Sequence, residues 1–164
     1  MFRVIFVCTA NICRSPMAEY CLKQLIQREG LAEQILSESA GTLAVDGMPI
    51  TEKAAQVCAE HGLDASAHRS RHVNIHLLRD ANLILGMELH HKSDLQIIFP
   101  QFASKIYLLK EYGRENRPEN YSILDPYGQT IEAYRKTFSE IETVIQNVWP
   151  EIKKQVASPL KSVK

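Results

Sequence analysis

The chain has 164 residues, of which 45% are hydrophobic and 23% are charged, and its 19 basic side chains balance its 19 acidic ones. This length and composition predict one soluble globular domain, and the zero net charge excludes a general electrostatic attraction to nucleic acid or to an anionic membrane. No apolar run approaches the roughly 18 residues of a membrane-spanning helix, and four cysteines without Cys-x-x-Cys or zinc-ligand spacing favour a reduced, cytoplasmic protein.

The chain begins with a predicted strand and a predicted helix that are joined by a polar turn. Apart from Arg3, residues 2–7 are apolar and β-branched or aromatic, which is typical of a strand buried on both faces. After the turn at 9–14, Ser15-Pro16 predicts a helix start, because serine caps helices and proline fits the first helical position. Apolar residues at helical spacing continue this helix towards Gly30.

The rest of the chain alternates between strands and helices. Strands are predicted at 33–39, 82–87 and 105–109, and helices at 50–61, 88–97 and 130–147, with Pro150 beyond the last helix. Residues 113–130 read as a long loop, and 156–164 as a flexible tail after a single domain at 1–155. This alternation predicts an α/β fold, a doubly wound four-stranded parallel sheet in flavodoxin-like order, flanked by helices. Ligands bind beyond the carboxyl ends of such strands, where the turn at 8–15 lies.

The turn between the first strand and the first helix carries the candidate chemistry. Its sequence is Cys8-Thr9-Ala10-Asn11-Ile12-Cys13-Arg14-Ser15. A turn into a helix directs several backbone N–H groups at one point and adds partial positive charge, which favours a bound anion and a Cys8 thiolate. The planar guanidinium of Arg14 suits two phosphate oxygens, and Ser15 can donate a hydrogen bond to the sulfur. These residues predict a nucleophile in an anion cradle rather than a buried structural cysteine.

A thiolate nucleophile also needs an acid to protonate the leaving oxygen. The candidate is Asp125, in the segment Leu124-Asp125-Pro126-Tyr127-Gly128 of the long polar loop. Pro126 restricts Asp125 to an extended conformation and stiffens the loop. Taken alone, the segment is more typical of an ordinary Asp-Pro turn.

The segment from Phe6 to Glu19 resembles the active-site signature of the low-molecular-weight protein tyrosine phosphatases, and Asp125-Pro126-Tyr127 resembles their general-acid motif. Ser39-Ala40-Gly41 also matches, and the resemblance covers essentially the whole chain. It implies that Cys8 attacks the phosphorus of phosphotyrosine to form a phosphocysteine, while Arg14 binds the phosphoryl oxygens. Asp125 would protonate the leaving phenolate and then activate water. The resemblance implies no cofactor and no metal.

The same resemblance implies supporting roles for further residues. Phosphate binding and loop support would involve Thr9, Ala10, Asn11, Ile12, Cys13, Ser15, Ser39 and His68. The substrate rim would consist of Leu43, Val45 and Tyr127. Cys13 matches the family's second loop cysteine, and two interpretations stay open: a reversible disulfide with Cys8, or a packed free thiol.

Three positions distinguish this chain within the family. The common loop has Gly where this chain has Ala10, whose methyl group would crowd the turn if that residue needed a positive φ. Leu43 or Val45 stands where animal-type members carry an aromatic residue. This aliphatic position makes the chain more similar to bacterial members, including those acting on tyrosine kinases of polysaccharide export. The implied partner is therefore a phosphotyrosine protein such as a bacterial tyrosine kinase. Ile12 favours phosphotyrosine, because similar members directed at phosphoarginine carry Thr there.

Two alternative functions compete with the phosphatase. An arsenate reductase on the same scaffold would need a relay of further cysteines, and this chain has none between residues 59 and 164. A phosphotyrosine-binding module would be expected to lack the nucleophile or the acid, and both are present. His90 and His91 are predicted to be surface or helix residues with no third metal ligand. The sequence does not indicate an oligomeric state.

Overall fold

The computed structural model describes residues 1–114 and 119–158. Its centre is a parallel sheet of four strands in the order β2-β1-β3-β4. The strands are β1 (Phe2–Cys8), β2 (Ile35–Gly41), β3 (Leu83–Gly86) and β4 (Ile106–Leu108). This order is flavodoxin-like, which confirms the predicted fold class. β2 begins and ends two residues later than the sequence predicted.

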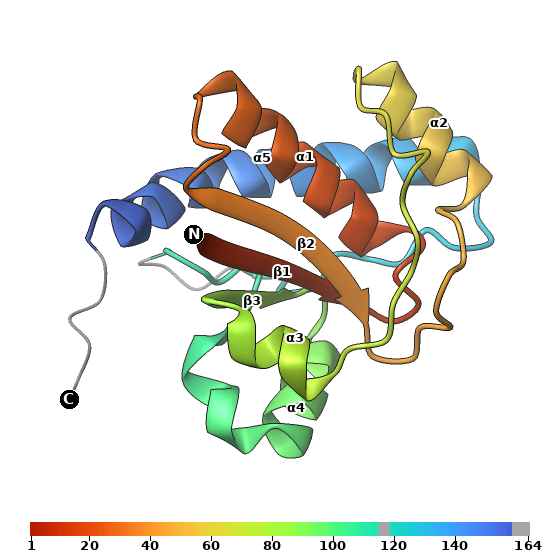
Figure 1. Ribbon diagram of the computed structural model, residues 1–164. Helices are drawn as coiled ribbons and strands as arrows, with labels where there is room; N and C mark the ends of the chain where they lie inside the picture. Colours follow the sequence, from red (N-terminus) through yellow and green to blue (C-terminus); the bar gives the residue numbers. More distant parts are fainter. Residues whose placement is uncertain (115–118, 159–164) are drawn as a thin grey trace.

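Helices cover both faces of the sheet (Figure 1). One face carries α1 (Arg14–Arg28), α2 (Glu52–Glu60) and α5 (Ile131–Ala157), and the other carries α3 (Ile75–Asp80) and α4 (Leu89–Ile98). A 3-10 helix, Pro100–Lys105, leads from α4 into β4.

Alternate side chains of β1 point to the two faces of the sheet and build two hydrophobic cores. Val4 and Phe6 pack in the larger core, together with side chains of α1 and α5. Ile5 and Val7 pack in the smaller core, which α3 and α4 cover. Because both faces are buried there, β1 is apolar from Val4 to Cys8, as predicted for a central parallel strand.

The last helix is longer than the sequence predicted. α5 continues through Pro150 to Ala157 instead of ending at residue 147. A proline inside a helix costs about 3 kcal/mol, whereas burial of one large apolar side chain contributes about 1.5–3 kcal/mol. Val148, Trp149 and Ile152 are all buried in this stretch, so tertiary packing outweighs the proline. Residues 156 and 157 of the predicted tail thus belong to α5, and 159–164 lie outside the described residues.

One short helix, α3, was not predicted from the sequence. Its local signal is Asn74, whose side-chain oxygen accepts hydrogen bonds from the backbone N–H groups of His76 and Leu77 at 3.0 Å each. Leu78 is the buried residue that fixes the helix on the smaller core.

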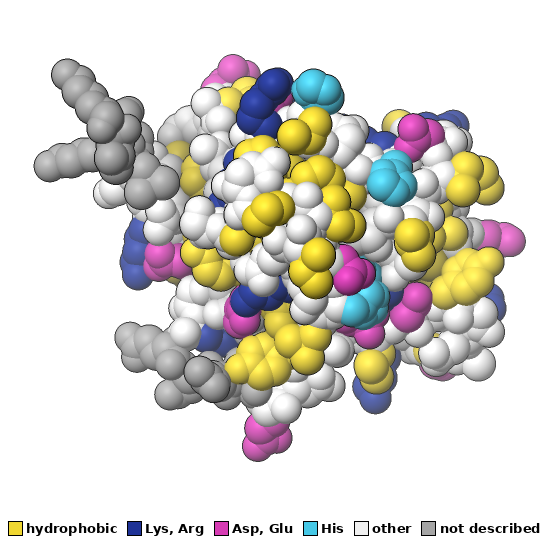
Figure 2. All heavy atoms as spheres, turned by 90° about the horizontal axis from the view of Figure 1, so that it is seen from below, with side chains coloured by type: hydrophobic (Ala, Val, Ile, Leu, Met, Phe, Trp, Pro, Cys, Tyr) yellow, Lys and Arg dark blue, Asp and Glu magenta, His cyan; other side chains and the backbone are white. Residues whose placement is uncertain are grey.

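The face formed by α3 and α4 is shown in Figure 2. Hydrophobic, acidic, basic and histidine side chains are interspersed on it, so neither sign of charge gathers into one patch there. In the described parts of the chain, no helix has the length and apolar character needed to cross a membrane.

Candidate active site

Asn11 stabilises the tight conformation of the turn after β1. This residue has a φ of 58° and is the one non-glycine residue among those described that adopts a left-handed conformation. Its side-chain amide donates to Ser15 Oγ and to Ser39 Oγ, each at 2.8 Å. Because Asn11 and not Ala10 takes the positive φ, the methyl group of Ala10 causes no backbone strain.

Cys8 lies at the base of this turn and is 3% exposed. Its Sγ is 2.9 Å from Ser15 Oγ and accepts a hydrogen bond from the backbone N–H of Asn11 at 3.3 Å. α1 begins at Arg14, so the positive end of its dipole lies beside the sulfur. These donors stabilise a thiolate. The prediction that Ser15 caps α1 is wrong, because Ser15 lies inside the helix and Cys13 is its N-cap.

The residues that follow β2 are hydrogen-bonded to the Cys8 turn. Thr42 N and Leu43 N donate to Cys8 O and Thr9 O, each at 2.9 Å. A Cβ placed on Gly41 would lie 2.5 Å from Thr9 O and 2.9 Å from Ala44 Cβ, closer than packed atoms can approach, and 3.0 Å from Asn11 N. Glycine at this position therefore permits the contact between β2 and the turn.

Arg14 and Asp125 meet in the pocket that Cys8 also lines. The guanidinium of Arg14 is buried, and its Nη1 lies 2.5 Å from Glu88 Oε2 and donates to Ile123 O at 2.8 Å. Its Nη2 lies 3.2 Å from Asp125 Oδ2. Asp125 Oδ1 accepts a hydrogen bond from the backbone N–H of Tyr127 at 3.1 Å, which orients the carboxylate.

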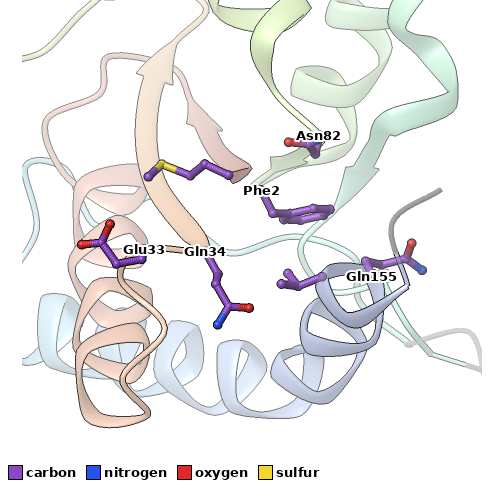
Figure 3. A pocket seen from close by; sticks show the side chains of 7 residues that line it. Phe2, Glu33, Gln34, Asn82 and Gln155 are labelled. Atoms are coloured by element: carbon purple, nitrogen blue, oxygen red, sulfur yellow. The ribbon is translucent and has the colours of Figure 1, made fainter. Parts of the chain in front are cut away.

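These groups share one pocket of about 350 Å³ at the carboxyl end of the sheet. Its lining residues are Cys8, Thr9, Ala10, Ile12, Cys13, Arg14, Asp125 and Tyr127. A second hollow of about 440 Å³ lies at the other end of the sheet, around Phe2, Asn82 and Gln155 (Figure 3). The residues described in its wall include no cysteine, histidine or arginine, so they provide neither a thiol nucleophile nor a guanidinium that could bind phosphate.

The family model for low molecular weight phosphotyrosine protein phosphatases matches residues 3–158. The chain belongs to this family. A protein-arginine-phosphatase of Bacillus subtilis is 34% identical, over 92% of this chain and 97% of its own. The low molecular weight protein-tyrosine-phosphatase Ptp of Acinetobacter johnsonii is 37% identical, over 87% and 92%. A solved low molecular weight protein tyrosine phosphatase from T. tengcongensis has a TM-score of 0.84 at 36% identity, and the match covers 92% of this chain and 99% of that one. The family uses a cysteine-based mechanism, and this chain is a cysteine-dependent phosphatase.

The loop of this phosphatase is held by a buried polar network that extends beyond the residues predicted from sequence. His68 Nε2 lies 2.7 Å from the backbone oxygen of Asn11. Nε2 donates this hydrogen bond, because a carbonyl oxygen can only accept. Burial lowers the pKa of His68, although the bond to Asn11 acts the other way. Glu19 was missed: its carboxylate accepts from Ser39 Oγ at 2.5 Å and pairs with Lys23. The only sequence signal for Glu19 was its place inside the signature segment.

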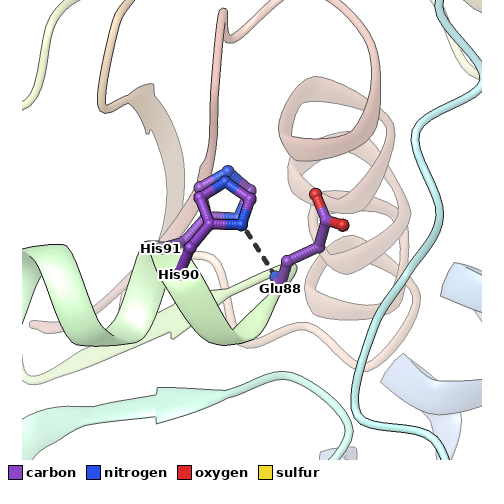
Figure 4. Close-up of side chains that lie close together, drawn as sticks. All are labelled: Glu88, His90 and His91. Atoms are coloured by element: carbon purple, nitrogen blue, oxygen red, sulfur yellow. Dashed lines mark hydrogen bonds between the residues drawn. The ribbon is translucent and has the colours of Figure 1, made fainter.

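Two further residues come from the start of α4 (Figure 4). Glu88, the N-cap of α4, pairs with Arg14 and was not singled out from the sequence. His91 lies on α4, in agreement with the prediction of a surface or helix residue, but its side chain is buried, with 0% exposure. One ring nitrogen, Nε2, is 2.9 Å from Thr9 Oγ1, and the other, Nδ1, accepts from Glu88 N at 3.1 Å.

The prediction that His90 and His91 have no third metal ligand is wrong, because Glu88 offers one, and the three potential ligand atoms lie within 4.8 Å of one another. Both ring nitrogens of His91 are already hydrogen-bonded, and the Glu88 carboxylate pairs with Arg14. A metal ion here would have to displace these contacts, which connect the cluster to the phosphatase loop. The cluster is therefore explained by hydrogen bonding and does not fit a metal centre.

Cys13 and the predicted rim residues differ in their relation to the pocket. Cys13 lines it, with Sγ 3.4 Å from Thr51 Oγ1 and 3.5 Å from Tyr134 Oη, and burial raises the pKa of its thiol. Tyr127 lines the mouth and is exposed. Leu43 and Val45 are exposed on the loop after β2 and are not among the lining residues.

Proposed function

We propose that this chain is a protein tyrosine phosphatase that hydrolyses phosphotyrosine through a phosphocysteine on Cys8. The observation that carries this proposal is the shared pocket of Cys8, Arg14 and Asp125 at the N-terminus of α1. A nucleophile, a charge clamp and a carboxyl group face one space, as two-step phosphoryl transfer requires.

In the first step, the Cys8 thiolate attacks phosphorus while the bond from phosphorus to the tyrosine oxygen breaks. Asp125, entering as the carboxylic acid, gives its proton to that oxygen, and neutral tyrosine leaves. Arg14 and the backbone N–H groups of the loop bind the non-bridging oxygens, whose charge they stabilise.

In the second step, the Asp125 carboxylate accepts a proton from water as the water oxygen attacks phosphorus. The bond from phosphorus to sulfur breaks, inorganic phosphate forms and the Cys8 thiolate is restored. Ser15 Oγ and the Asn11 N–H, at 2.9 and 3.3 Å from Sγ, support sulfur as the leaving group.

Phosphotyrosine is favoured over phosphoarginine by the pocket wall. Ile12 presents an apolar side chain and Tyr127 an aromatic ring, which suit the phenyl group of tyrosine. A phosphorylated guanidino group carries N–H donors, for which Ile12 offers no acceptor. Phosphoarginine is the second candidate substrate, because the Bacillus subtilis relative is named an arginine phosphatase.

The proposed partner is a phosphotyrosine protein, such as a bacterial tyrosine kinase, in the cytoplasm. The relatives are named protein phosphatases, which supports a protein substrate. The free thiols of Cys8, Cys13, Cys21 and Cys58 support a reducing compartment.

The test measures phosphate release from a phosphotyrosine peptide and from the matching phosphoarginine peptide. We expect preferential hydrolysis of phosphotyrosine, no activity for Cys8→Ser, and a loss of roughly 10²- to 10³-fold for Asp125→Ala. Ile12→Thr should lower the ratio of phosphotyrosine to phosphoarginine hydrolysis. Activity that survives Cys8→Ser would refute the mechanism, and a preference of the unaltered chain for phosphoarginine would establish the second candidate.

A further inference from the structure

The protonation state of His91 follows from its two hydrogen bonds. The backbone N–H of Glu88 can only donate, so the His91 Nδ1 that lies 3.1 Å away is its acceptor. A neutral ring with an unprotonated Nδ1 carries its proton on Nε2. That proton is donated to Thr9 Oγ1, 2.9 Å away. The hydroxyl of Thr9 therefore acts as acceptor towards His91 and keeps its own proton free.

Thr9 connects this contact to the reaction. It follows Cys8 directly in the chain and lines the same pocket as the nucleophile. Its backbone oxygen accepts from Leu43 N at 2.9 Å, and its side chain is held by His91, so both ends of the residue are fixed.

The residue before the N-cap of α4, Met87, anchors the helix start that carries His91. Met87 N donates to Val7 O at 3.0 Å, and Ile123 N donates to Met87 O at 2.9 Å, so this helix start is tied to β1 and to the segment before Asp125. A Cβ on Gly86 would lie 3.3 Å from His91 Cβ, a close contact that shows how tightly the end of β3 packs against this helix start.

The same helix start also positions the guanidinium of Arg14. The carboxylate of Glu88 pairs with Arg14, while the backbone N–H of Glu88 sets the tautomer of His91. The two residues thus connect one helix start to both the loop that carries the nucleophile and the guanidinium of Arg14.

We propose that His91 is a positioning residue for the phosphatase reaction, which holds Thr9 and the adjoining Cys8 loop in the conformation that receives the phosphoryl group. This inference rests on the proposed reaction at Cys8 and assigns His91 a role in it. His91 touches neither the thiol nor the carboxyl group and acts through Thr9.

The environment of His91 keeps the ring in the state that this role needs. Burial, then the neighbouring charges of His90 on α4 and Arg14 on α1, lower its pKa to about 3. Of the other charged groups at this turn, the carboxylate of Glu88 is paired with Arg14 and the ammonium group of Lys92 is paired with Glu111. A protonated ring would set an Nδ1–H against the N–H of Glu88, so the neutral form is also required by geometry.

Two conservative variants separate this role from simple capping of α4. His91→Asn retains an acceptor near the position of Nδ1 and loses the donor to Thr9. His91→Gln retains a donor near the position of Nε2 and loses the acceptor for Glu88 N–H. We expect kcat/KM for the phosphotyrosine peptide to fall about tenfold in His91→Asn and to stay within about threefold in His91→Gln. His76→Asn, at an exposed histidine of α3, is the matched control.

A double-mutant cycle with Thr9→Val tests whether the effect passes through Thr9. If it does, adding His91→Asn to Thr9→Val lowers kcat/KM by less than twofold further, and inorganic phosphate inhibits both single variants less strongly than the unaltered chain. Full additivity, or losses in both His91 variants that follow their melting temperatures, would overturn the proposal.

An unaltered chain without activity on phosphotyrosine would instead refute the proposed function. Inhibition constants for vanadate would then be compared between the variants on whichever substrate is hydrolysed.

Discussion

Arg14 Nη2 lies 3.2 Å from Asp125 Oδ2 at the edge of the Cys8 pocket. Both residues are assigned to the proposed reaction but with different roles, since Arg14 binds phosphate and Asp125 transfers a proton. The carboxylate and a phosphate group therefore compete for the same buried guanidinium.

Replacing Asp125 by Asn separates these two effects. We expect kcat to fall roughly 10²- to 10³-fold, because the amide cannot transfer a proton. Inorganic phosphate should inhibit the variant at least as strongly as the unaltered chain, because the competing negative charge is gone. Initial rates with and without added phosphate measure both quantities. Asp94→Asn, at an exposed carboxylate of α4, is the control, and weaker inhibition by phosphate in Asp125→Asn would contradict the competition.

Glu88→Gln tests the other ion pair of Arg14. The variant keeps the size of the side chain but removes the negative charge 2.5 Å from Arg14 Nη1, leaving the bond from Nη1 to Ile123 O. A less firmly oriented guanidinium should lower kcat/KM by about tenfold. Steady-state kinetics with the phosphotyrosine peptide provide the measurement. Glu33→Gln, an exposed residue at the far end of the sheet, should be neutral, and equal activity of the two variants would count against this role for Glu88.

Gly41→Ala tests the contact between β2 and the turn. The added methyl group would meet Thr9 O at 2.5 Å, and neither backbone can yield without moving the turn. We expect a loss of about 1–3 kcal/mol in the free energy of unfolding, which lowers the melting temperature by several degrees at this chain length. The loss of phosphatase activity should be larger than the fraction of unfolded protein explains, because the displaced turn carries the nucleophile. Gly86→Ala is the graded comparison, because its closest contact, 3.3 Å to His91 Cβ, leaves more room. Equal melting temperatures for Gly41→Ala and the unaltered chain would contradict the packing argument.

His91 should also make the protein sensitive to acid. Its pKa is lowered from an ordinary 6.5 to about 3 in the folded chain, so between these values the unfolded chain binds a proton that the folded chain does not. The free energy of unfolding should therefore fall as the pH drops from about 6.5 towards 3, by an amount on the order of 4 kcal/mol from this group. Urea unfolding at several pH values, compared between the unaltered chain and His91→Gln, measures the difference. The variant should lose less stability over this range, and parallel pH profiles would contradict the assignment.

Cys13 is proposed to protect the nucleophile by forming a reversible disulfide with oxidised Cys8. Burial raises the pKa of the Cys13 thiol, so we expect disulfide formation to accelerate as the pH rises and more thiolate becomes available. After treatment with hydrogen peroxide, dithiothreitol should restore activity to the unaltered chain but much less to Cys13→Ser. Equal recovery in both proteins would favour the interpretation of Cys13 as a packed free thiol.

Local sequence determined the part of the site that lies between β1 and α1. An apolar strand, a polar turn and a helix start occupy consecutive residues, so Cys8, Arg14 and Ser15 are brought together by the chain itself. The same applies to Asn11, whose left-handed conformation is a property of the turn. The parallel arrangement of the strands also followed from the alternation of strands and helices, because parallel strands need helical crossovers.

The tertiary structure decided what surrounds this turn. Glu88 and His91 belong to the residues that follow β3, and they reach Arg14 and Thr9 only because β3 pairs with β1. Neither residue type at that position indicates such a contact, since an acidic residue and a histidine at a helix start are usually solvated. The extension of α5 through Pro150 has the same origin, because burial against the core outweighs a local helix-breaking preference. Sequence alone thus determined the groups that are neighbours along the chain, whereas contacts between distant segments depend on packing free energies that no local pattern contains.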